Sequence, residues 1–307
     1  MEIPKEKWLE MLAYEAFIRR AAEVDSPFML KGSYVTRQYF PNPMMRLPND
    51  LDWVYMLPLT TVEEARTLFD SWVTQVTELS MGDGVVFESF TKNAFWRMID
   101  YAMADDFPTV NTDLVCWVEG EKFDWFSLDV SFNLDIEVPP VSLIYQPVQG
   151  ELFLVPNTVP LALQVAWKMH QTLVRPRFKD IFDLTQLLKH PDFNQTTLEQ
   201  TLQALVNECR VDQVDTGLLK WFFTGDLQPL FREVNVTDAW RYWALGVTSR
   251  NRLAYYEKAE YITDPQGLPL ELADFVERFR TSLTSAGFTP EILRNLPTPT
   301  RKKRMGH

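Results

Sequence analysis

The feature that most constrains the fold is the segment 28–55, FMLKGSYVTRQYFPNPMMRLPNDLDWVY. Its apolar start is followed by Gly32-Ser33 and by a stretch of helical composition that ends near Phe40. This order predicts a strand, a tight turn and a helix. Gly32 would let the backbone pass close to a ligand, and Ser33 is expected at the N-cap, with the free N–H groups of the helix pointing outward. Such a turn can bind an anion.

The same segment ends in two carboxylates. After a loop rich in Pro and Asn, residues 50–57 are DLDWVYML, which has strand composition. Residues two apart on a strand share a face, so Asp50 and Asp52 are expected side by side. Two such carboxylates repel each other, and a divalent cation relieves the repulsion. A phosphate-binding turn followed by paired carboxylates is what metal-dependent transfer to or from a nucleoside triphosphate requires.

Neither half of this segment is specific alone. A Gly-Ser before a helix is most often a cap, and Asp-x-Asp is most often a solvated strand end. Their order and proximity favour a functional interpretation. The motif LKGS at 30–33 followed by DLD at 50–52 resembles the first motif of the nucleotidyltransferase superfamily, and most of all its AbiEii/AbiGii toxin branch.

A third carboxylate lies farther along the chain. Residues 123–132, FDWFSLDVSF, alternate between large apolar and small polar side chains, which predicts a strand with one packed face. Asp129 lies in the middle of the polar face, where an ordinary exposed Asp is the structural alternative. In the superfamily that the first motif resembles, an Asp on a neighbouring strand completes the metal site, and Asp129 is the matching position. Many members have a Lys two residues earlier, where this chain has Ser127. The resemblance implies three catalytic metal ligands: Asp50, Asp52 and Asp129.

The remaining candidate functional residues lie at the start of the second half of the chain, in its first predicted helix and the motif that follows it. Residues 161–179 contain no acidic side chain, and Gln164 and Lys168 lie four apart on one helical face. The motif KDIFDL follows, with Asp180 and Asp183 one turn apart. A structural alternative is that these charges pair across a helical hairpin and only hold it together.

With the first motif in place, these residues resemble the third and fourth motifs of the AbiEii/AbiGii family, so that the resemblance covers about residues 28–190. Asp180 is expected to orient Lys168 or to contact the acceptor, and both are expected to be catalytic. The resemblance implies a nucleotide-binding set drawn from both halves of the chain: Gly32, Ser33, Gln164, Lys168 and Asp183.

The chain is expected to have an α+β fold with two domains. Residues 1–157 would form a nucleotidyltransferase-like mixed sheet with flanking helices, and residues 158–307 an all-helical domain that completes the active-site cleft and ends in a basic tail. The first range has 11 Lys and Arg against 25 Asp and Glu, and the second has 19 against 17. Affinity for phosphates rests on Lys and Arg. RNA contacts are therefore expected in the second domain, at Arg175, Arg177 and Lys179.

The implied function is transfer of a nucleoside monophosphate from an NTP to RNA, chiefly tRNA. It would use two Mg²⁺ ions, in a toxin–antitoxin or phage-defence setting with a cognate antitoxin protein as a partner. One alternative is nucleotide transfer onto a protein side chain, which the acidic first domain favours. Another is a non-catalytic nucleotide- or antitoxin-binding module. A metal-dependent nuclease would have no need of Gly32-Ser33 or Lys168.

The cysteines and the hydropathy pattern suggest a compartment. Cys116 and Cys209 are far apart in sequence and form neither a disulfide framework nor a zinc motif. The N-terminal residues carry charges throughout, which is unlike a signal peptide. No stretch approaches the length of apolar sequence that a membrane span needs. A cytoplasmic protein without membrane contact is expected.

Overall fold

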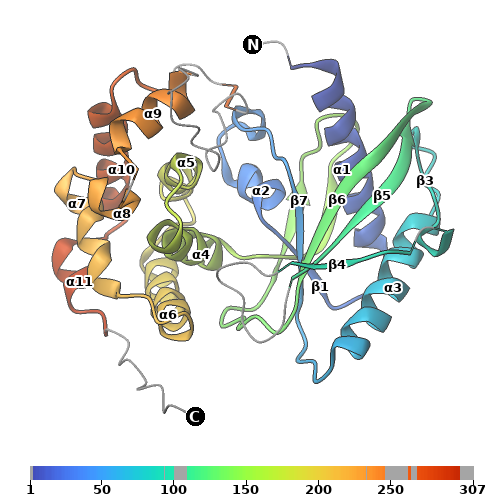
Figure 1. The fold of residues 1–307 in the computed structure, drawn as a ribbon, viewed down its shortest axis with the longest axis horizontal. Coiled ribbons are helices and arrows are strands. Elements are labelled where there is room, and N and C mark those ends of the chain that lie inside the picture. Colours follow the sequence, from blue (N-terminus) through green and yellow to red (C-terminus); the bar gives the residue numbers. More distant parts are fainter. Residues whose placement is uncertain are drawn as a thin grey trace. The chain divides into compact units, whose positions relative to one another are not determined.

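The computed structural model describes residues 3–92, 94–99, 109–232, 234–245, 262–263 and 268–297 (Figure 1). It contains two compact units. Unit 1 comprises Met1–Gln38 and Asn42–Pro160, and unit 2 comprises Tyr39–Pro41 and Leu161–His307. The sequence placed the division after residue 157, whereas the structure places it after Pro160. The basic tail expected at residues 298–307 lies outside the described residues.

Eight strands form one mixed sheet in the described part of unit 1, in the order β3-β5-β6-β2-β1-β8-β7, with β4 paired to β5. The central strand β2 runs parallel to β6 and antiparallel to β1, and β1 runs parallel to β8. Unit 1 therefore has the expected mixed sheet. The strands are β1 Phe28–Lys31, β2 Leu51–Tyr55, β3 Val85–Phe87, β4 Arg97–Ile99, β5 Thr109–Val118, β6 Glu121–Ser131, β7 Val141–Tyr145 and β8 Phe153–Thr158.

The alternation in β6 explains how the sheet presents one polar face. Phe126, Leu128 and Val130 are 3%, 0% and 0% exposed and face the core. Ser127 and Asp129, on the other face, are partly exposed. The predicted division of this strand into a packed face and a polar face is confirmed.

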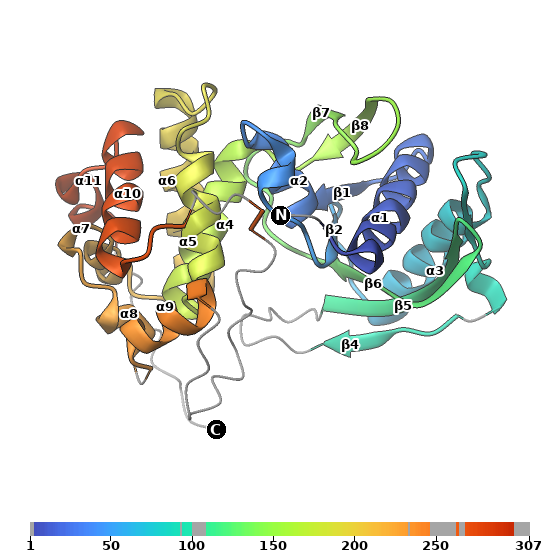
Figure 2. The same cartoon turned by 90° about the horizontal axis from the view of Figure 1, so that it is seen from above.

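Two long helices cover the packed face. Helix α1, Lys5–Glu23, contacts β3, β5, β6 and β8 as well as α3, Val62–Glu78 (Figure 2). Phe17 of α1 and Trp72 of α3 meet edge to face, with ring centroids 5.7 Å apart. Helix α3 begins at a side-chain cap, because Thr61 Oγ1 accepts a hydrogen bond from the backbone N–H of Glu64 at 3.1 Å. These helices therefore pack on the face of the sheet that is opposite its polar face.

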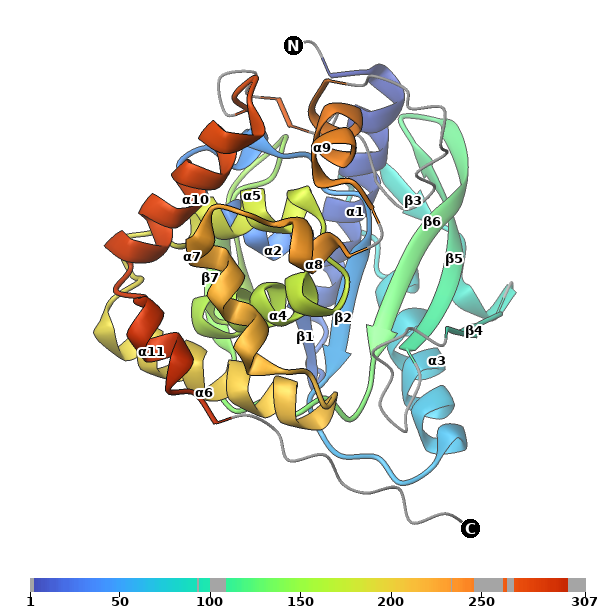
Figure 3. The ribbon, with the colours of Figure 1, turned by 60° about the vertical axis from the view of Figure 1, so that its left-hand side comes forward.

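The regular elements in the described part of unit 2 are all helices, and Ile262 is a single bridge residue outside them. Helix α4 contacts both α5 and α6 (Figure 3). The sheet of unit 1 and the helices of unit 2 together confirm the predicted α+β fold class. The 3-10 helix η4 continues directly into the short helix α7, and another short helix, α8, follows them. None of the helices in the described ranges has the length and apolarity needed to span a bilayer. The elements are α4 Leu161–Val174, α5 Phe178–Leu187, α6 Gln195–Val211, η4 Thr216–Lys220, α7 Trp221–Thr224, α8 Gln228–Phe231, α9 Val236–Leu245, α10 Leu272–Ser285 and α11 Pro290–Arg294.

Candidate active site

Two of the three predicted carboxylates are neighbours on the polar face of the sheet. In the parallel pairing of β2 with β6, Asp52 lies in register with Asp129. In the antiparallel pairing of β1 with β2, Lys31 lies in register with Asp52, and its Nζ is 3.8 Å from Asp52 Oδ1. The fold therefore joins two motifs that are far apart in sequence, with an ammonium group beside them.

Asp50 lies one residue before β2 and is exposed. Its surroundings include Tyr14 of α1, whose hydroxyl oxygen accepts a hydrogen bond from the backbone N–H of Ser127 at 3.2 Å. Burial raises the pKa of the Tyr14 phenol, and the negative charge of Glu10, followed by those of Asp50 and Asp129, raises it further. Tyr14 is thus a neutral hydroxyl near the carboxylates.

The carboxylates suit a hard divalent cation in type. Asp52 and Asp129 offer oxygen ligands from adjacent strands, and Mg²⁺ usually takes one or two protein carboxylates and fills its other positions with water and substrate phosphates. Within the ranges that the structure describes, no group of three His, Cys, Asp or Glu side chains is arranged to hold a metal ion. The three-carboxylate site that includes Asp50 stays a prediction.

The turn after β1 depends on glycine. Gly32 has φ +74° and ψ −156°, and a Cβ at this position would lie 2.1 Å from Asp52 Oδ2. The N-cap of α2, Ser33–Thr36, is Gly32 and not Ser33, as had been predicted. The expected helix to Phe40 is also shorter, because a 3-10 turn at Arg37–Tyr39 follows this four-residue helix. The glycine conformation turns the chain one residue earlier than the composition indicated.

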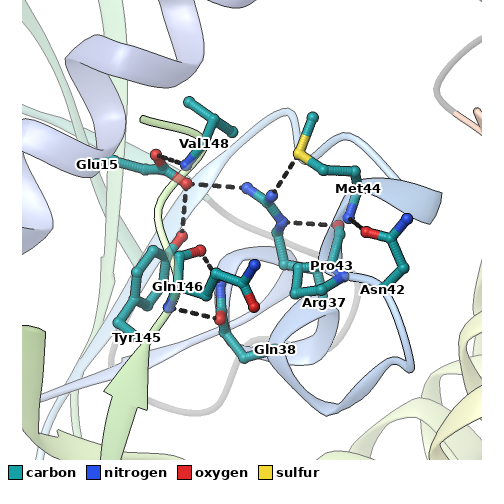
Figure 4. A network of polar contacts seen from close by, with 9 residues as sticks. All are labelled: Glu15, Arg37, Gln38, Asn42, Pro43, Met44, Tyr145, Gln146 and Val148. Atoms are coloured by element: carbon teal, nitrogen blue, oxygen red, sulfur yellow. Dashed lines mark hydrogen bonds and ion pairs between the residues drawn. The ribbon is translucent and has the colours of Figure 1, made fainter. Parts of the chain in front are cut away.

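The chain between this turn and Asp50 is anchored by a buried arginine (Figure 4). Arg37 Nη1 lies 2.9 Å from Glu15 Oε1 of α1. Its Nε donates to the carbonyl oxygen of Pro43 at 2.9 Å, and its Nη2 lies 3.1 Å from Met44 Sδ. One guanidinium therefore ties the Pro43-Met44 part of this loop to the first helix.

Glu15 is the second centre of the network in Figure 4. Its Oε1 also accepts from the Tyr145 hydroxyl at 3.1 Å, and its Oε2 accepts from the backbone N–H of Val148 at 2.7 Å. Burial raises the pKa of Glu15, although the charge of Arg37 opposes this effect. The network joins α1, the loop before Asp50 and the end of β7.

In unit 2, α4 and α5 bring the predicted residues Lys168, Asp180 and Asp183 together. Lys168 Nζ lies 2.7 Å from Asp183 Oδ2 and 3.5 Å from Asp180 Oδ1. The two carboxylates are 0% and 1% exposed, respectively. Gln164, one turn before Lys168, is also buried. The ion pairs across the helical hairpin that the structural alternative predicted are present, and Asp183 holds the ammonium more closely than Asp180 does.

Asp180 also forms an ion pair with Arg177, one of the predicted RNA-binding residues. Arg177 Nε donates to Asp180 Oδ2 at 2.6 Å. Burial alone would raise the pKa of Asp180, but the charges of Arg177 and Lys168 outweigh it and lower this pKa to about 2. Of the three predicted RNA contacts, Arg175 is exposed, whereas Arg177 and Lys179 are partly buried.

A protein-family model matches a range of the sequence that includes both clusters. The family model described as "Nucleotidyl transferase AbiEii toxin, Type IV TA system" matches residues 16–244. The chain belongs to the AbiEii family. Membership of this toxin family supports transferase activity, and it implies an NTP substrate and a cognate antitoxin. The matched range includes all the residues proposed from the motifs, from Gly32 to Asp183.

A solved structure supports the fold of this AbiEii-family chain. The chain is similar to MenT4, a nucleotidyltransferase toxin from Mycobacterium tuberculosis H37Rv, with a TM-score of 0.50 and 14% sequence identity. The similarity covers 95% of this chain and 88% of MenT4. No curated protein matches the sequence significantly. The match extends over almost the whole of both chains and concerns the fold.

Two polar residues near the predicted site residues of this AbiEii-family chain were not identified from the sequence. Tyr14 lies on α1, outside the motifs from which the site was predicted. Asn111 of β5 lies in register with Asp129 and donates a hydrogen bond to its Oδ1. The polar alternation of Thr109, Asn111 and Asp113 along β5 could have indicated a strand facing the site.

Proposed function

We propose that this AbiEii-family protein is a Mg²⁺-dependent nucleotidyltransferase that transfers a nucleoside monophosphate from an NTP to RNA of the tRNA class. The observation that carries the proposal is the register of Asp52 with Asp129 beside the Gly32 turn. In the proposed reaction an acceptor hydroxyl attacks the α-phosphorus of the NTP. The bond to the bridging oxygen breaks, and pyrophosphate leaves.

The residues of unit 1 would bind the reacting groups. Gly32 and Ser33 would hold the terminal phosphates, since the glycine allows the backbone to approach closely. The carboxylates of Asp50, Asp52 and Asp129 would hold two Mg²⁺ ions, which supply positive charge to the triphosphate and to the attacking oxygen when they are bound. Asp129 would also help to remove the proton from the acceptor hydroxyl.

Lys168 of unit 2 would supply positive charge to the triphosphate. Its ammonium group has three N–H donors, and its Nζ lies 2.7 Å from Asp183 Oδ2 and 3.5 Å from Asp180 Oδ1. These buried carboxylates would hold the ammonium in one position, so that the remaining N–H can donate to a phosphate oxygen. Gln164 and Asp183 would complete the nucleotide-binding set, with Asp183 acting through Lys168.

RNA would be bound by the less acidic part of the chain. Arg175, Arg177 and Lys179 would contact its phosphates, and Arg177 would do so while its Nε remains bonded to Asp180. The toxin family supports a setting in which a cognate antitoxin limits the activity. The reaction would take place in the cytoplasm, where NTPs and tRNA occur.

The test is incubation of the purified chain with each α-labelled NTP, Mg²⁺ and either total RNA or a protein extract. We expect the RNA to take up label, and the label to be lost in the Asp52→Asn and Asp129→Asn variants. Asp25→Asn is the matched control, because it removes an exposed carboxylate outside the site. If a protein takes up the label and RNA does not, the acceptor is a protein side chain and not RNA. Absence of label with every NTP and both extracts would overturn the proposed activity.

A further inference from the structure

The register of the sheet extends the carboxylate pair into a row of polar residues. Asp129 on β6 lies opposite Asn111 on β5, and Asn111 lies opposite Arg97 on β4. Together with the pairing of Asp52 to Lys31 and Asp129, this gives a continuous row across five strands. The two acids thus have an ammonium on one side and an amide followed by a guanidinium on the other.

The amide of Asn111 is fixed by its partners. Its Nδ2 donates to Asp129 Oδ1 and, at 2.8 Å, to Ser127 Oγ, while its Oδ1 accepts from Arg97 Nη2 at 2.5 Å. If the amide were reversed, its oxygen would face the carboxylate of Asp129 and its NH₂ group would face the guanidinium. Asn111 is 5% exposed, so water cannot relieve such a mismatch. Arg97 therefore sets the direction in which Asn111 donates.

Arg97 is itself held in place. Its Nη2 donates to Asp113 Oδ2 at 2.7 Å, and its guanidinium carbon lies 5.1 Å from the centre of the Phe95 ring. Asp113 is two residues after Asn111, on the same face of β5. The Arg97 side chain is half exposed, so its contribution comes from the direction of its hydrogen bonds more than from burial.

The bond between Asn111 and Asp129 is not needed to pair the two strands. Their backbone register extends from Val110 opposite Val130 to Val118 opposite Glu121. In the next rung, Thr109 Oγ1 and Ser131 Oγ lie 3.2 Å apart and make a second side-chain bond between the strands. The specific effect of Asn111 is therefore on the carboxylate of Asp129.

We propose that Asn111 is a positioning residue for Asp129, and that Arg97 acts through Asn111 by fixing its amide. This proposal rests on the proposed function, in which Asp129 holds metal with the nucleotide. By orienting one oxygen of Asp129, the amide reduces the rotation that the carboxylate loses when it binds a cation. Partners of metal ligands typically change metal affinity or activity by about 10- to 100-fold when removed.

The test measures Mn²⁺ binding to the full chain in the presence of a nonhydrolysable NTP, by titration calorimetry. We expect Asn111→Leu to weaken Mn²⁺ binding about 10- to 100-fold. Asn111→Ser, which is too short to reach the carboxylate and guards against a failure of the Leu variant to fold, should do the same. Thr109→Val is the matched control, because it removes a side-chain bond between the same strands without touching Asp129. It should leave Mn²⁺ affinity unchanged.

Variants of Arg97 test whether this residue acts through the amide of Asn111. Arg97→Met should weaken Mn²⁺ binding less than Asn111→Leu does, and Arg97→Lys should restore part of the loss. The double variant should be no worse than Asn111→Leu alone, since Arg97 acts through the amide.

Two failures are distinguishable. Wild-type Mn²⁺ affinity in folded Asn111→Leu and Asn111→Ser, or an equal loss in Thr109→Val, would overturn the positioning role alone. Absence of NTP-dependent Mn²⁺ binding in the wild-type chain would overturn the proposed function together with this inference.

Discussion

The backbone of Gly32 lies so close to Asp52 that a Cβ would be 2.1 Å from Oδ2 and 2.8 Å from Cγ. Gly32→Ala would therefore displace a predicted metal ligand and also force Ala into a conformation that L-residues rarely adopt, at a cost of about 1–3 kcal/mol. We expect loss of Mn²⁺·NTP binding and of nucleotide transfer. Binding is measured by calorimetry and stability by urea unfolding.

Gly82→Ala is the control for this substitution. Gly82 also has a positive φ, +67°, but a Cβ there would meet nothing within 4 Å. The control should lose stability without losing nucleotide binding. If Gly32→Ala bound Mn²⁺·NTP as tightly as the wild type, the close approach to Asp52 would have no functional meaning.

At the scale of elements, the ion pair between Arg37 and Glu15 fixes the loop that leads to Asp50. Arg37→Met would leave Glu15 as a buried carboxylate without its cation, and removal of one partner of a buried pair costs about 3–5 kcal/mol. We expect a large loss of stability in urea unfolding. Adding Glu15→Gln should recover part of it, because the buried charge is then removed. Lys5→Met, which removes the exposed pair with Glu121, should have little effect, and an equal loss there would contradict the assignment.

Elements were predictable where local pattern decides them. The alternation in β6 predicted which side of the strand is polar, and the spacing in α4 placed Gln164 and Lys168 on one face. Asn111 could not be assigned to Asp129, because the register of β5 with β6 shifts at an irregularity between Leu114 and Cys116. The N-cap at Gly32 depends on a backbone angle that composition does not specify. Similarly, the hydrogen bond from the Ser127 backbone N–H to the Tyr14 hydroxyl depends on how α1 packs on the sheet.

At the scale of the whole molecule, aromatic packing indicates what the C-terminal helices contribute. Phe178, at the start of α5, lies between rings of later helices. Its centroid is 4.8 Å from Phe231, 5.3 Å from Trp240 and 6.1 Å from Phe275. Because Phe178 is two residues before Asp180, this packing holds the start of the helix that supplies both carboxylates of the Lys168 cluster. The later helices thus support part of the proposed nucleotide site.

The distribution of charge leads to a prediction for RNA binding. The net charge is −14 for residues 1–157 and +2 for residues 158–307. Arg175 is the exposed member of the predicted RNA contacts. Arg175→Ala should weaken RNA binding and reduce the slope of log affinity against log salt by about one counterion. Mn²⁺·NTP binding should be unchanged. Lys5→Ala, a surface cation of unit 1, is the control, and an unaltered salt slope in Arg175→Ala would remove this residue from the RNA surface.

The pairing of β2 with β6 also limits which misfolded forms of unit 1 can persist. A shift of one residue would turn every side chain of β6 to the opposite side relative to its neighbours. Asp52 would then lie beside Leu128 or Val130, both fully buried, and the carboxylate of Asp129 would enter the apolar layer. Burying an unpaired charge is costly, so a chain with this error would not remain compact. The position that serves the chemistry thus also penalises incorrect strand pairing during folding.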